Sequence, residues 1–182
     1  MKGKSKVAVF DFDGTLTTGD SLLPFLYYCF GFWKLTIGIL YLSPFIIGYL
    51  LKVYPNNLAK KKLVNYFFKN RDVNLLKKIA SRFIDEKIDY FIRNNILKRL
   101  RWHQKNDHVT ILLSASLDLY INYVGEKYNF DHVECSILEI DKHLFTGQIK
   151  GDNCYGNEKV KRLKKILGDN LTGYTLYGYG AV

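Results

Sequence analysis

The stretch Val7–Thr17, VAVFDFDGTLT, decides the fold of this 182-residue chain. Its first four residues are apolar and rich in valine, as expected of a short buried strand. Asp11 and Asp13 follow, and the Gly-Thr pair after them is typical of a tight turn. Ligands of open α/β sheets bind just beyond the carboxyl ends of the strands. Two neighbouring carboxylates there predict a catalytic or binding site. Two close acids are both ionised at low free-energy cost only beside a cation; otherwise they take different protonation states and different roles. A solvated Asp-Gly turn is the structural alternative.

The string FDFDGTLT at 10–17 resembles the first motif of the haloacid dehalogenase-like superfamily of phosphohydrolases. The resemblance implies that Asp11 is the nucleophile, which attacks phosphorus and forms an aspartyl-phosphate. It also implies that Asp13 is the general acid and base, which protonates the leaving oxygen and later activates water. The implied cofactor is Mg²⁺, held by the Asp11 carboxylate and the backbone carbonyl of Asp13. The cation would keep Asp11 ionised and leave Asp13 free to hold a proton.

The second motif of the family, a Ser or Thr that holds a phosphate oxygen, is matched by Ser114. This residue follows a second expected buried strand, Val109–Leu113. The backbone N–H of Ala115 would assist, as N–H groups at strand-to-helix turns do. Ser116 is expected to be an N-cap of the helix that begins near Asp118.

The third motif of the family is a cation that neutralises phosphate and nucleophile together, and Lys159 matches it. Lys159 lies at the start of an expected helix in the string GNEKVKRL at 156–163. Lys161 is the alternative, and the remaining cations of this run are expected to form a solvated face.

The fourth motif is where the sequence departs from the family, which places a Mg²⁺-binding Asp after the last strand. Here the expected strand Tyr174–Tyr177 is followed by Gly-Tyr-Gly, then Ala181 and Val182, with no acid. We therefore expect a C-terminus truncated or altered at this motif. Magnesium binding would be weakened but not excluded, since Mg²⁺ accepts one or two carboxylates with several waters. An inactive remnant acting as a membrane- or anion-binding module is the alternative to an active phosphatase.

Within the superfamily, the chain resembles subfamily IB, the phosphoserine phosphatase-like branch, which inserts a helical cap after the first motif. The strings that carry this resemblance are DSLLPFL at 20–26, LSAS at 113–116 with Tyr120, and LFTGQ at 144–148. Asp20 lies where phosphoserine phosphatases carry a substrate-contacting Glu, and an N-cap for the first cap helix is its alternative role. The branch also includes membrane-associated lipid phosphatases. The implied substrate is therefore a small-metabolite phosphate such as phosphoserine, or a lipid phosphate.

The order of the expected elements predicts an α/β fold with a doubly wound, mainly parallel, Rossmann-like sheet. The predicted core comprises 1–19 and 104–182, and the predicted helical cap comprises 20–103. Apolar residues recur every three or four positions over 57–102, which predicts helices. A β-hairpin is expected over 137–149, and helices are expected at 118–128 and 158–167.

The net charge of +10 is confined to the predicted cap. Residues 20–103 contain 15 Lys+Arg against 5 Asp+Glu, whereas the remainder of the chain contains 12 of each. This asymmetry predicts an anionic partner for the cap, either a phosphorylated substrate or an anionic membrane surface. Nucleic acid is the least favoured partner because only the charge points to it. A solvated basic face would have the same composition.

The first half of the predicted cap, residues 21–54, is apolar and aromatic with only two charges, Lys34 and Lys52. Residues 35–51 carry no charge, which is slightly short of a membrane span. Pro44 is expected to kink or divide a helix here. The alternatives are a buried hairpin of the cap, a segment lying in the lipid interface, and a span or re-entrant hairpin.

The three cysteines, Cys29, Cys135 and Cys154, form neither a metal-binding pattern nor a disulfide framework. This usage fits a reducing compartment. An expected strand within about six residues of Met1 leaves no room for a secretory signal. We therefore expect a cytoplasmic protein, either free or peripheral at the inner face of the membrane.

Overall fold

A computed structural model describes residues 5–53 and 56–180 and contains a four-stranded parallel sheet. The strand order is β3-β2-β1-β6. The strands are β1 (Ser5–Phe10), β2 (Val109–Leu117), β3 (His132–Ser136) and β6 (Tyr174–Tyr179). The apolar residues Val7, Ala8 and Phe10 of the inner strand β1 are buried, as the sequence predicts. The prediction of an α/β fold with a parallel sheet is confirmed.

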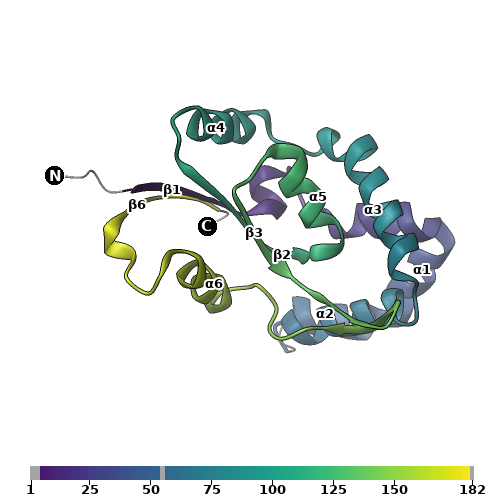
Figure 1. Cartoon of the computed structure of the whole chain (residues 1–182). Coiled ribbons are helices and arrows are strands. Elements are labelled where there is room, and N and C mark those ends of the chain that lie inside the picture. The colour runs from purple at the N-terminus through teal and green to yellow at the C-terminus, as the bar shows by residue number, and fades with distance from the viewer. Residues whose placement is uncertain (1–4, 54–55, 181–182) are drawn as a thin grey trace.

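Helices cover both faces of the sheet (Figure 1). They are α4 (Asn94–Lys105), α5 (Asp118–Tyr128) and α6 (Asn157–Leu167). Figure 1 shows α4 and α5 on one side of the strands and α6 on the other, which is the doubly wound arrangement. A short turn, η3 (Leu171–Gly173), connects α6 to β6.

The strand order reverses beside β1, because the chain builds β2 and β3 on one side of it and β6 on the other. The backbone N–H of Asp11, directly after β1, donates to the Tyr179 carbonyl of β6 at 2.8 Å. Ligands of such sheets bind in the crevice at the carboxyl end of the strands where the order reverses. The first carboxylate of the deciding stretch therefore lies at the topological switch point.

A second group of helices gathers beyond the carboxyl ends of β1 and β2 (Figure 1). Its members are α1 (Leu22–Leu50), α2 (Asn56–Phe68), α3 (Val73–Lys87) and the short η2 (Ile88–Tyr90). An antiparallel hairpin of β4 (Leu138–Asp141) and β5 (Leu144–Ile149) packs against α2. These helices lie over the switch point and can cover a ligand bound there.

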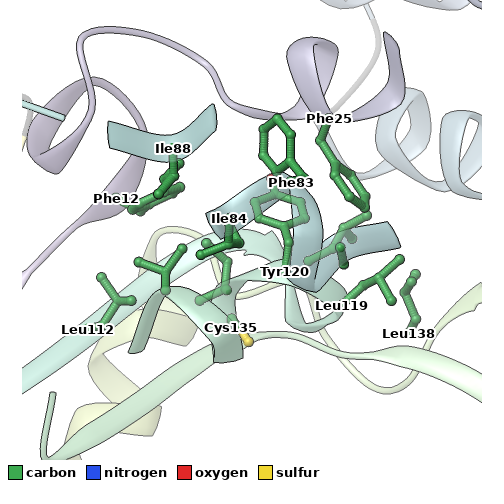
Figure 2. Close-up of a cluster of buried hydrophobic side chains, with 14 of the residues drawn as sticks. Phe12, Phe25, Phe83, Ile84, Ile88, Leu112, Leu119, Tyr120, Cys135 and Leu138 are labelled. Atoms are coloured by element: carbon green, nitrogen blue, oxygen red, sulfur yellow. The ribbon is translucent and has the colours of Figure 1, made fainter. Parts of the chain in front are cut away.

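One hydrophobic cluster joins the helical group to the sheet layer (Figure 2). The ring of Phe25 in α1 lies 4.6 Å from that of Tyr120 in α5 and 5.3 Å from that of Phe83 in α3. Helix α4 crosses the predicted boundary at 103/104 and packs against β2. The division into an α/β core at 1–19 and 104–182 and a cap at 20–103 stays a prediction. The hydrophobic cluster contains residues of both parts.

Helix α1 is divided at Gly31, whose φ of +75° and ψ of 172° are open to glycine but strained for other residues. The sequence predicts that Pro44 kinks or divides the helix. The predicted division is wrong, because helical dihedral angles continue through Pro44, and the kink stays a prediction. By length and composition alone, α1 could cross a membrane, and only 11% of its most apolar 18-residue window is buried. The buried-hairpin alternative therefore describes only part of this segment.

Candidate active site

The loop after β1 is built by a buried threonine. Thr17 Oγ1 accepts a hydrogen bond from the Gly14 N–H at 3.2 Å and donates to the Gly19 carbonyl at 2.7 Å. Gly14 has a φ of +72°, the left-handed region where glycine is unstrained. Phe12 turns into the core between the two acids. Asp11 and Asp13 are consequently held on the other side of the loop from the core.

Asp11 forms an ion pair with Lys159, whose Nζ lies 2.8 Å from Asp11 Oδ1. Both side chains are about one quarter exposed, at 28% and 22%, so a small ligand can reach them. Lys159 lies in the first turn of α6, as expected. The alternative cation, Lys161, instead pairs with Glu158 at 3.4 Å and is 72% exposed. The structure thus brings the expected lysine to the expected nucleophile.

Asp13 has a different environment from Asp11. Its Oδ1 accepts a hydrogen bond from the Ser21 N–H at 2.8 Å, and its Oδ2 accepts one from Ser116 Oγ. Behind them, Ser21 Oγ hydrogen-bonds the hydroxyl of buried Tyr120 at 3.0 Å. Burial raises the pKa of Asp13 above its ordinary value, and the hydrogen bonds only partly oppose this. A carboxyl with a raised pKa is suited to holding a proton.

The residues after the second predicted strand do not form a turn, because β2 continues to Leu117. Pairing with β3 shifts register between Leu113 and Leu117, so the expected phosphate-binding residues lie in an irregular strand. Ser114 Oγ is buried and accepts a hydrogen bond from the Ser116 N–H at 3.0 Å.

The N-cap role predicted for Ser116 is wrong. Leu117 precedes the first residue of α5 and makes no side-chain cap bond, while the Ser116 hydroxyl bonds Asp13. The difference arises because β2 continues to Leu117, which leaves Ser116 within the strand and Leu117 at the N-cap position of α5. Ser116 is therefore a site residue that the sequence did not identify.

Lys60 of α2 is a second residue that sequence reasoning missed. Its Nζ donates to the Ala115 carbonyl, to Asn153 Oδ1 at 2.6 Å and to Ser136 Oγ at 3.2 Å. Burial lowers the pKa of Lys60 to about 8. The sequence does not distinguish Lys60 from its neighbours Lys61 and Lys62. What distinguishes them is which side of α2 packs against the rest of the protein.

Asp20 acts as a cap. Its Oδ1 accepts hydrogen bonds from the N–H groups of Leu22 at 2.9 Å and Leu23 at 3.2 Å, at the start of α1. Its charge contributes to the raised pKa of Asp13, so the two acids are close. Its role as a substrate contact stays a prediction.

The oxygen atoms at the end of β1 have the chemistry that Mg²⁺ accepts. The Asp11 carboxylate and the Asp13 backbone carbonyl are hard donors, and Mg²⁺ sites are completed by phosphate and water. The described residues contain no cluster of three or more His, Cys, Asp or Glu that could hold a metal. Position 181, where the family places a further ligand, lies outside the described residues. The donor set fits a water-rich magnesium site. Thr15 Oγ1 is buried here without a hydrogen-bond partner.

Comparison with known families places nearly the whole chain in one group. The family model for haloacid dehalogenase-like hydrolases matches residues 8–180. The chain is 28% identical to protein CicA of Caulobacter vibrioides over 179 residues, which cover 94% of this chain and 77% of that protein.

Solved structures share the fold. A protein of unknown function from Bordetella pertussis Tohama I superposes with a TM-score of 0.83 at 17% identity, covering 96% of this chain and 81% of that chain. A phospho-aspartyl intermediate analogue of phosphoserine phosphatase gives a TM-score of 0.63 at 18% identity, covering 96% and 78%. A substrate-bound phosphoserine phosphatase gives 0.64 at 17% identity, covering 97% and 79%. At these identities the likeness concerns the fold alone.

Proposed function

The chain belongs to the haloacid dehalogenase-like hydrolases, and we propose that it hydrolyses a phosphate monoester through an aspartyl-phosphate on Asp11. The observation that carries this proposal is the 2.8 Å pair between Asp11 and Lys159 at the switch point of the sheet. The pair holds the carboxylate that would attack phosphorus at the position where ligands of such sheets bind. The same cation can neutralise an arriving phosphate.

In the first half of the reaction, a carboxylate oxygen of Asp11 forms a bond to phosphorus on the side opposite the leaving group. The bond between phosphorus and the ester oxygen breaks, and Asp13 donates its proton to that oxygen as the alcohol leaves. The raised pKa of Asp13 supports this role because it favours the protonated form. Ser21 and Ser116 would fix the orientation of the donor.

In the second half, Asp13 is a carboxylate and takes a proton from water. The resulting hydroxide bonds to phosphorus, the acyl–phosphate bond breaks, and inorganic phosphate and the Asp11 carboxylate are released. Lys159, with Ser114 and the Ala115 N–H, would hold the phosphate oxygens as negative charge shifts between them. Protons and bonds balance over the two halves, and Asp13 returns to its protonated state.

Magnesium would be held by the Asp11 carboxylate and the Asp13 carbonyl, and when bound it supplies positive charge against the phosphate. Thr15 Oγ1, which is buried in the same loop without a hydrogen-bond partner, is one further oxygen beside these two donors.

The substrate is proposed to be the phosphate monoester of a small metabolite or of a lipid. Phosphoserine phosphatases are among the proteins of similar fold, which makes phosphoserine the first metabolite to test. The basic α2–α4 region favours a substrate with anionic groups beyond its phosphate.

The test is turnover of an aryl phosphate with and without Mg²⁺. We expect activity in the wild type and loss in Asp11→Asn. Lys159→Met should lose most activity, while Lys161→Met should keep it. Asp141→Asn in the remote β4 is the control for an exposed acid. If the folded protein binds inorganic phosphate but never turns over, the anion-binding remnant replaces the phosphatase.

A further inference from the structure

The second part of α1, after the break at Gly31, carries a single charged residue, Lys34, and is covered by the protein on only one side. Its covered side lies against α2, where a Cβ on Gly38 would meet the Phe67 ring at 2.4 Å and the Tyr66 ring at 2.7 Å. Gly38 and Leu42 are buried there. The close approach shows that this contact is a built packing interface.

The opposite side of the same segment is exposed, and we call it the apolar face. Its residues are each 53–77% exposed: Trp33, Ile37, Leu40, Ile47 and Leu50 in α1, with Leu51 and Val53 directly after its end. Tyr41, which is 68% exposed, lies at the edge of this face, because its ring stacks on that of Tyr66 in α2 at 5.4 Å. Most residues of the face recur every three or four positions, so they line one side of the helix. Contiguous exposed apolar surfaces of this kind mark interaction sites.

Basic side chains border the apolar face, and acids are absent from its sequence. Lys34 Nζ lies 4.7 Å from the Phe30 ring, with Arg71 5.8 Å from the same ring, near one end. Lys52 follows the other end, and Lys62 Nζ lies 5.2 Å from the Phe45 ring. No Asp or Glu occurs between Ser21 and Tyr54. The rim is therefore positive and complements an anionic surface.

We propose that the apolar face docks this protein on an anionic lipid bilayer, with α1 lying in the plane of the interface. Trp and Tyr at such a face suit the headgroup level, and nearby lysines attract anionic lipids. A second copy of this face would bring like charges together. A transmembrane position would take the lysines of α2 into hydrocarbon together with the packed helix.

Docking in this plane brings the helical group, and not the opposite end of the sheet, toward the lipid (Figure 1). The proposal does not depend on the proposed reaction, since it uses none of the site residues. Vesicle binding and turnover can therefore fail separately.

The test is co-sedimentation of the full chain with vesicles of phosphatidylcholine alone, and of phosphatidylcholine with phosphatidylglycerol at about two to one. We expect binding to the anionic vesicles. Ile37→Glu and Leu40→Glu should each weaken partitioning about ten- to hundredfold. Leu75→Glu is the matched control, because Leu75 is 59% exposed but lies on α3. Lys52→Gln and Lys62→Gln should each reduce anionic binding about fivefold.

A spectroscopic measurement identifies the face directly. In Trp102→Phe the remaining indole is that of Trp33, whose emission should shift to the blue and be quenched by brominated lipids. If the wild-type protein co-sediments with neither kind of vesicle, the proposal is overturned. Dimerisation that Leu40→Glu abolishes in the absence of vesicle binding also overturns it. Membrane association that high salt and alkaline carbonate cannot release would indicate a span and overturn the in-plane position.

Discussion

The two acids after β1 are close in sequence, but their surroundings differ and so do their proposed roles. Asp11 faces a lysine and is partly open, whereas Asp13 is enclosed by Ser21, Ser116 and the buried Tyr120 layer. A nucleophile must be ionised and a general acid must carry a proton. The side chains around each residue favour the state that its proposed role requires.

Asp13→Asn should stabilise the protein at neutral pH while abolishing turnover. The raised pKa of Asp13 means that its ionised form is disfavoured in the folded state. Relative to the Asn variant, wild-type stability is complete at acidic pH and is lost as the pH rises through the folded pKa. Thermal unfolding of both proteins across this range, with chelator present, measures the difference. A Tm gap that does not grow toward neutral pH would contradict it.

Lys60→Met should destabilise the fold by about 1–3 kcal/mol. Without Lys60, the buried acceptors at Ala115 and Asn153 have only the single hydroxyl hydrogen of Ser136 to share, so one of them is left without a donor. Lys61→Met, its exposed neighbour, should stay within about 0.5 kcal/mol. Urea unfolding gives both values.

The pH dependence provides a separate check on Lys60. Its pKa of about 8 lies below the ordinary 10.5, so the unfolded chain binds more protons between those values. Wild-type stability relative to Lys60→Met should therefore rise over that interval. A flat difference would show that Lys60 is not buried as described.

At the scale of elements, the break in α1 sets the direction of its second part. Gly31→Ala should cost about 1–3 kcal/mol, because its φ of +75° with an extended ψ suits glycine only. Gly19→Ala is the control, since nothing lies within 4 Å of a Cβ there and its φ is ordinary. Urea unfolding should separate the two variants clearly. Equal stability would mean that the chain does not need the break.

The elements show why some of the site could be predicted and some could not. The strand before Asp11 and the helix carrying Lys159 follow from local composition, so their residues could be named in advance. The contacts of Ser116 and Lys60 depend on long-range packing, between β2 and the β1 loop and between α2 and β3. In α3, the spacing of the apolar residues predicts a helix but does not show which side of it faces the protein interior. Leu75, for example, is exposed, whereas its neighbour Leu76 is buried.

At the scale of the molecule, the shared cluster in Figure 2 predicts a single unfolding transition. Calorimetric and van't Hoff enthalpies should agree. Phe83→Ala should lower the free energy of unfolding by about 3–5 kcal/mol and leave a single transition, because Phe83 packs against both Phe25 and Tyr120. Two resolved transitions would show that the helical group folds separately.

The proposed mechanism requires Asp11 to carry the phosphoryl group during turnover. Rapid acid quenching of the enzyme during aryl phosphate hydrolysis, followed by reductive trapping and peptide mapping, tests it most directly. We expect a modification on the peptide that contains Asp11, present only with substrate and absent in Asp11→Asn. Turnover that leaves this peptide unmodified, or that survives in Asp11→Asn, would contradict it.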